Sequence, residues 1–128
     1  MSYFFSKKLV MNFENAMTRI TEELKKEGFG ILTEIDVKAT LKKKLDVDFR
    51  KYTILGACNP AFAYKALQAE PHIGTMLPCN VIVQELADGK VEVAAVDPLA
   101  SMQAIQNQEL QAIAKEIQLK LKRVIGQL

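Results

Sequence analysis

The sequence predicts an α+β domain with a mixed, mostly antiparallel sheet of about five strands and helices on one face. Two kinds of segment lead to this expectation: wholly apolar or alternating runs typical of strands, and runs with apolar residues spaced three and four apart, typical of helices. They follow one another in the order β-α-β-(α)-β-α-β-β-α. Only the last two strands are joined by a tight-turn signal, Asp88-Gly89.

Composition limits the function classes. The 128 residues, 49% hydrophobic and 25% charged, suit a single domain over residues 1–128 that buries a core without disulfides. The net charge is only +2 and the basic residues are scattered, so we expect no nucleic-acid partner. No apolar run reaches membrane-spanning length and no signal peptide is visible. We therefore expect no membrane partner and a cytoplasmic location.

The first third of the chain reads as strand, helix, strand and short helix. Residues 3–11 form the expected first strand, and Asn12 is placed to cap a helix that ends at Gly28. Residues 30–37 alternate as in a half-buried strand. Asp36 is placed to cap a short helix. The apolar stripes of the two helices are Phe13, Ala16, Met17, Ile20 and Leu24, then Val37, Leu41 and Leu45.

The middle of the chain contains a nearly continuous apolar run, residues 51–58, which predicts an interior strand. Gly56 near its end indicates close approach of backbone or of a ligand. Asn59 is expected to cap the next helix and Pro60 to be its first residue. That helix has the apolar stripe Phe62, Ala63, Ala66 and Leu67, and residues 72–78 are expected to form a loop.

The last third predicts two strands and a long helix. Residues 79–86 and 90–96 are the strands, and residues 99–106 are expected to form a short helical connection. Asn107 is placed to cap the final helix, which we expect to pack on the sheet. Its apolar stripe consists of Leu110, Ile113, Ala114, Ile117, Leu121, Val124, Ile125 and Leu128.

The segment 56–81 carries the candidate site. Both cysteines of the chain lie in it, each followed by an asparagine and close to a proline, and the only histidine, His72, lies between them. The predicted ligand-binding residues are Cys58, Asn59, Pro60, Pro78, Cys79 and Asn80. The two cysteines share one end of the sheet only if their strands run antiparallel, and the intervening helix permits either direction.

Three functions fit these residues. In the favoured one, the motif builds a pocket or a dimer interface, the asparagines cap backbone groups and the cysteines are small buried hydrophobes. In the second, Cys58 and Cys79, with Met76 or His72, bind a soft metal such as copper or zinc, or act as a thiol-redox pair. In the third, Cys58 is a reactive thiol with His72 as its base. Neither a cofactor nor a substrate can be named from the sequence.

Five segments resemble the domain-of-unknown-function 302 family. They are Gly28 to Val37, Ile54 to Pro60, Ala63-Tyr64, Leu77 to Val81 and Val96 to Pro98. The resemblance implies a small α+β fold like that of TATA-box-binding protein, a homodimer, no DNA binding and an unassigned activity. The predicted site residues coincide with the family's motif positions. Strands three and four are apolar on both faces, which also predicts a homodimer closed through the uncovered face of the sheet.

Overall fold

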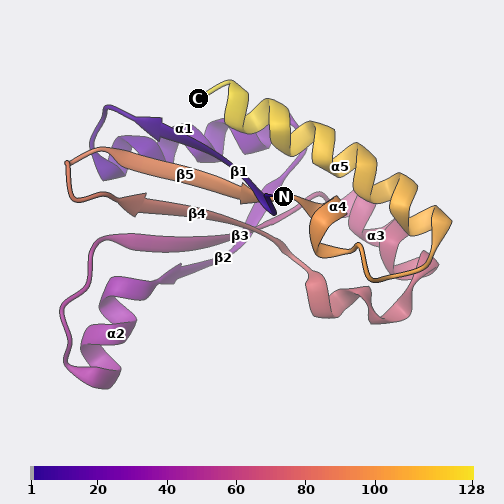
Figure 1. Cartoon of the computed structure of the whole chain (residues 1–128), viewed down its shortest axis with the longest axis horizontal. Coiled ribbons are helices and arrows are strands. Elements are labelled where there is room, and N and C mark those ends of the chain that lie inside the picture. Colours follow the sequence, from indigo (N-terminus) through magenta and orange to yellow (C-terminus); the bar gives the residue numbers. More distant parts are fainter. Residues whose placement is uncertain (1) are drawn as a thin grey trace.

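The structure, a computed structural model, describes residues 2–128. One five-stranded sheet has the order β1-β5-β4-β3-β2 (Figure 1). The strands are β1 (Phe4–Leu9), β2 (Gly30–Asp36), β3 (Tyr52–Cys58), β4 (Cys79–Glu85) and β5 (Val91–Val96). The predicted α+β class with five strands is confirmed.

All neighbouring strands of the described chain are antiparallel, so the sheet is not mixed. The helical connections explain this. The helices α2 (Val37–Leu45) and α3 (Pro60–Ala69) lie beyond opposite ends of the sheet rather than across its face (Figure 1). Each therefore acts as an enlarged hairpin that returns the chain beside the strand it has just left, whereas a parallel neighbour would need a crossover along the sheet.

Two helices cover one face of the sheet, as predicted. They are α1 (Phe13–Lys26) and α5 (Gln108–Gly126) (Figure 1). The side chain of Asn12 accepts a hydrogen bond from the Asn15 amide at 2.7 Å, and that of Asn107 accepts from the Leu110 amide at 3.0 Å. Both predicted N-caps are confirmed, and Gly28 ends the first helix with φ +87°.

The core lies between this helical layer and the sheet. Alternate residues of β3, β4 and β5 point into it, and so do the predicted stripe of α1 and the second half of the predicted stripe of α5, from Ile117 onward. The hydrophobic residues that β3, β4 and β5 bury in this core are Leu55, Ala57, Cys79, Val81, Val83, Val91, Val93 and Ala95, and β1 adds Leu9. The opposite face of the sheet has no covering helix among residues 2–128.

Strand β2 does not form the half-buried surface that its alternation predicts. A register shift between Ile31 and Thr33 breaks its pairing with β3, so Ile31 lies opposite Ala57 and Thr33 opposite Gly56. These two residues therefore face opposite sides of the sheet. Ile35 remains 47% exposed and Leu32 67% exposed, because β2 is an edge strand.

Helix α2 begins at the predicted cap, where the Asp36 side chain accepts a hydrogen bond from the Ala39 amide at 2.9 Å. None of its residues is buried, so the predicted apolar stripe is not a core stripe. The helix extends beyond the end of the sheet, where no other described element covers it (Figure 1).

Three short helical elements lie at the other end of the sheet. Helix α3 starts at Pro60 as predicted, but only Ala66 of its expected stripe is buried. The segment predicted as a loop instead begins with the 3₁₀-helix η1 (Pro71–Met76). The expected helical connection after β5 is the single turn α4 (Pro98–Ser101), capped by the side chain of Asp97.

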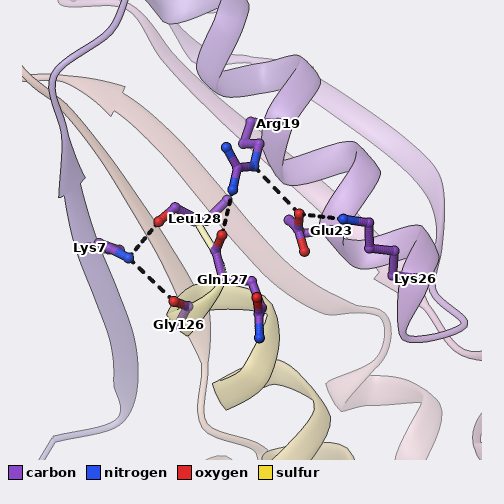
Figure 2. Close-up of polar contacts among 7 residues, drawn as sticks. All are labelled: Lys7, Arg19, Glu23, Lys26, Gly126, Gln127 and Leu128. Carbon is purple, nitrogen blue, oxygen red and sulfur yellow. Dashed lines mark hydrogen bonds and ion pairs between the residues drawn. The ribbon is translucent and has the colours of Figure 1, made fainter.

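The last turn of α5 is fixed to the sheet and to α1 by basic side chains (Figure 2). The Lys7 ammonium donates hydrogen bonds to the carbonyl oxygens of Gly126 and Leu128, and the Arg19 guanidinium donates to that of Gln127. Helix C-terminal carbonyls attract cations. These contacts hold α5 at one end, while its first half forms a wall of the cavity described next.

Candidate functional site

A cavity of about 300 Å³ lies where α3, η1, α4 and the first half of α5 meet the end of β3 and the start of β4. None of its nineteen lining residues is charged. The lining consists of Phe29, Leu32, Ala57, Cys58, Asn59, Phe62, Ala63, Ala66, Leu67, Gly74, Leu77, Pro78, Cys79, Pro98, Met102, Leu110, Ile113, Ala114 and Ile117. Its volume is at the lower end of the range for small-molecule sites, about 300–1,000 Å³.

Both cysteines lie at this cavity. Strands β3 and β4 are antiparallel, and Ala57 pairs directly with Cys79. Cys58, one residue further along β3, therefore reaches the same end of the sheet, and both residues line the cavity. The sequence left the strand direction open, and the antiparallel alternative is the one observed.

The two thiols differ in exposure. Cys58 is half-buried, whereas Cys79 is 8% exposed. Burial, and secondarily the nearby Cys58, raises the pKa of the Cys79 thiol to about 11. Cys79 is therefore a neutral thiol at pH 7, since a low-dielectric environment disfavours the charged form. Both cysteines are free thiols in this structure.

Asn59 occupies the predicted cap position of α3, but its side chain makes no capping hydrogen bond. Its Nδ2 instead donates to the carbonyl oxygen of Glu27 at 3.2 Å, just after α1 ends. A side chain at Gly28 would put its Cβ 3.1 Å from this Nδ2. Asn59, at the edge of the cavity, is therefore hydrogen-bonded to the end of α1. The prediction that its side chain caps α3 is wrong.

Four of the six predicted site residues line the cavity: Cys58, Asn59, Pro78 and Cys79. The other two do not. Pro60 is exposed as the first residue of α3. Asn80 is exposed and follows Cys79 in β4, so the strand alternation turns it to the uncovered face of the sheet.

Pro78 is held against β3. Gly56 and Pro78 approach so closely that a Cβ at position 56 would lie 2.8 Å from the Cγ of Pro78 and 2.2 Å from the Oγ1 of Thr33. A close approach was predicted at Gly56, but the approaching groups are the side chains of Thr33 and Pro78 rather than backbone or a ligand. The turn at Leu77-Pro78, which contains a cis peptide bond, is thereby seated beside the cavity.

The residues suggested to join the cysteines do not line the cavity. His72 has a side chain that is 92% exposed, and its Nδ1 lies 3.2 Å from a carboxylate oxygen of Glu70. Met76 is exposed on the last turn of η1. Within residues 2–128, no group of three or more His, Cys, Asp or Glu side chains is arranged to hold a metal ion.

Sequence reasoning missed the wall that α5 contributes. Leu110, Ala114 and Ile117 belong to a stripe that we assigned wholly to packing on the sheet. The length of the helix carried the missing signal. Nineteen helical residues span about 28 Å, whereas a strand of six or seven residues spans roughly 20–23 Å. The helix must therefore extend past the sheet by at least one turn, and in the structure its first half covers α3 (Figure 1).

The chain and its fold are similar to those of known proteins. The sequence profile of the family described as Domain of unknown function DUF302 matches residues 5–128. The chain belongs to the DUF302 family. The motifs that resemble this family lie within the matched residues, and the match extends to β1 and α5 on either side.

A solved DUF302 structure has the same fold. The crystal structure of an uncharacterized conserved DUF302 protein from Bacillus stearothermophilus is similar, with a TM-score of 0.91 and 26% sequence identity. The alignment covers 98% of each chain, so the whole architecture is shared. No curated protein matches the chain. No helix of residues 2–128 is both long enough and apolar enough to cross a membrane.

Proposed function

We propose that this DUF302 protein binds a small, largely apolar molecule in the cavity between α3 and α5. The observation that carries the proposal is the uncharged lining of a cavity of about 300 Å³. An apolar cavity of about 150 Å³ holds one benzene molecule, so this one has room for a ligand of roughly two fused or linked rings, or a chain of similar bulk.

The lining also indicates how the ligand would be oriented. Leu110, Ala114 and Met102 are buried and form an apolar wall. The polar groups of the lining are the Asn59 amide and the thiols of Cys58 and Cys79. Few polar groups in a mainly apolar pocket are typical of a ligand site, where they fix orientation rather than supply most of the affinity.

Indole is a suitable first probe. The chain has no tryptophan, so indole emission reports the ligand alone. We expect the emission to shift to shorter wavelength on binding. Replacing Ala63, which lines the cavity, by Phe should abolish the shift, because the new ring occupies the space that the ligand needs. Ala61→Phe on the same helix is the matched control, since Ala61 is exposed and outside the cavity lining.

If neither the unmodified protein nor Ala61→Phe shifts indole emission at millimolar ligand, and an organic extract of the purified protein contains no co-purified apolar compound, the cavity does not serve this function.

We further propose that the protein is a homodimer closed through the uncovered face of the sheet. On this face Ala94, Ile82, Ile54 and Ile35 pair in one apolar row across β5, β4, β3 and β2. Phe4 of β1 lies on the same face, opposite Val96 rather than in this row. A hollow of about 410 Å³ lies on it between the aromatic side chains of Tyr3 and Phe4 on one side and Tyr52 on the other. Tyr3 and Phe4 are exposed and their rings are in contact, and an exposed aromatic pair beside a hollow on the same face can fit a second copy about a two-fold axis.

Light scattering tests the dimer. A species of twice the chain mass of 14.3 kDa is expected at micromolar concentration. Ile82→Glu should convert it to a monomer, because the carboxylate would be buried without a partner. Leu119→Glu, on the exposed side of α5, should leave it unchanged. A monomeric unmodified protein would refute the dimer without affecting the cavity proposal.

The soft-metal and thiol-enzyme alternatives have less support. A zinc site usually has four protein ligands, and within residues 2–128 no third His, Cys, Asp or Glu side chain joins the two thiols. The polar contact of His72 is with Glu70, not with Cys58. Two free thiols are consistent with a reducing compartment, and we propose that the protein works in the cytoplasm.

A further inference from the structure

We infer that the ligand of the cavity is an amphipathic monocarboxylate, with its apolar body inside and its carboxylate between the ammonium groups of Lys65 and Lys120. This inference rests on the proposed binding function and names the class of molecule bound. The argument starts at Phe62, which lines the cavity and is also partly exposed, so its ring lies at the boundary between the cavity and solvent.

Two cations lie beside this ring. The Nζ of Lys65 is 5.5 Å from the centre of the Phe62 ring, and the Nζ of Lys120 is 5.8 Å from it. The first comes from α3 and the second from α5, so the two helices that enclose the cavity each contribute one ammonium group near this ring. Neither lysine is among the nineteen lining residues, so both reach the cavity only at the Phe62 ring.

These cations are poorly neutralised. Lys65 forms no ion pair with any acidic residue of the described chain, 2–128. Lys120 lies 3.9 Å from the carboxylate of Glu27, but the same carboxylate is held by Arg123 at 3.0 Å. The single carboxylate of Glu27 therefore pairs with two cations, Lys120 and Arg123, and Lys65 adds a third positive charge. An anion at this boundary would be attracted by the excess charge.

The uncharged lining of the cavity determines that the part of the ligand inside it is apolar. With no charged side chain in the lining, a charge inside the cavity would lose its hydration without gaining a partner. A bound anion must therefore keep its charged group at the boundary, where the ammonium groups lie. A ligand with one carboxylate and an apolar body satisfies both conditions.

Three eight-carbon compounds with different head groups test the inference: octanoate, octanol and octylamine. The alkyl tail of octanoate is one carbon shorter than the tails of octanol and octylamine, which favours the latter two. Tighter binding of octanoate in a calorimetric titration therefore reports its head group. Two partly exposed ammonium groups should favour octanoate over octanol by about tenfold, and octylamine should bind most weakly. The preference should shrink as salt is raised, because these groups are accessible to counterions.

The variant Lys65→Met, Lys120→Met keeps most of the apolar stems and removes both charges. Octanoate should bind it about tenfold more weakly than it binds the unmodified protein, whereas octanol should bind both equally. Lys115→Met is the matched control, because Lys115 is exposed on α5 and, unlike Lys65 and Lys120, its ammonium group does not lie over the Phe62 ring within the described chain.

Octanol binding as tightly as octanoate, or octanoate binding unaffected by the double substitution, would overturn the inference and leave the cavity function intact. Failure of all three compounds and of indole to bind would instead refute the cavity function itself. The two failures are therefore distinguishable.

Discussion

Replacing Gly56 by alanine should destabilise the protein, although the same change in a strand usually stabilises it. A Cβ at this position would lie 2.2 Å from the Oγ1 of Thr33 and 2.8 Å from the Cγ of Pro78, and real Cβ atoms do not approach other atoms so closely. The Thr33 hydroxyl can rotate away. The Pro78 ring cannot, because its atoms are closed on the backbone.

The size of the effect follows from two opposing terms. Overpacking a well-filled site costs about 1–3 kcal/mol. Alanine also restricts the unfolded chain more than glycine does, which stabilises the folded state by about 0.4–1 kcal/mol and offsets part of this cost. We therefore expect Gly56→Ala to lower the free energy of unfolding by about 1–2 kcal/mol. It should also weaken indole binding, since Pro78 lines the cavity and must move.

Urea unfolding followed by circular dichroism measures the change, with the midpoint and slope fitted separately. Gly30→Ala is the matched control. Gly30 is also a strand glycine, a Cβ there would meet nothing within 4 Å, and its substitution should be neutral or slightly stabilising. Adding Thr33→Ala to Gly56→Ala should recover only part of the loss, because the contact with Pro78 remains. A Gly56→Ala protein as stable as Gly30→Ala would refute the reasoning.

Two further predictions concern titratable groups. The pKa of the Glu23 carboxylate is lowered in the folded protein, mainly by the hydrogen bond from Lys26. The ionised carboxylate therefore stabilises the fold above the unfolded-state pKa of about 4.3, and this stabilisation is lost as the pH falls through the lower pKa of the folded state. Glu23→Gln should therefore flatten the acid limb of a stability–pH curve, and a limb unchanged in the variant would contradict this. Burial raises the pKa of Cys79 to about 11. The stability that comes from burying the neutral thiol is therefore fully present below about pH 8.5 and is lost as the pH rises toward 11. Native-state labelling with a disulfide reagent at pH 8 should modify Cys58 quickly and Cys79 only on unfolding, and equal rates for the two single-cysteine variants would contradict the assigned burial.

The sequence by itself determined most of the secondary structure. The caps at Asn12, Asp36 and Asn107 are local, since a side chain bonds to an amide three residues away. Gly28 ends its helix for an equally local reason, its positive φ. The stripes of α1 and α5 were readable because apolar residues spaced three and four apart mark the buried side of a helix, whatever that side contacts. The family resemblance, now supported by a match over residues 5–128, rested on motifs read in order along the chain.

Only the tertiary structure decided the site. Strand direction brought Cys58 and Cys79 together, and a helical connection by itself does not fix that direction. The amide of Asn59 binds the carbonyl of Glu27, thirty-two residues earlier, rather than its own helix. Because α5 extends past the sheet, part of its apolar stripe lines the cavity instead of packing on the sheet. Local patterns report which face of an element is apolar, but what that face meets depends on contacts between residues distant in sequence, and the cavity is made of such contacts.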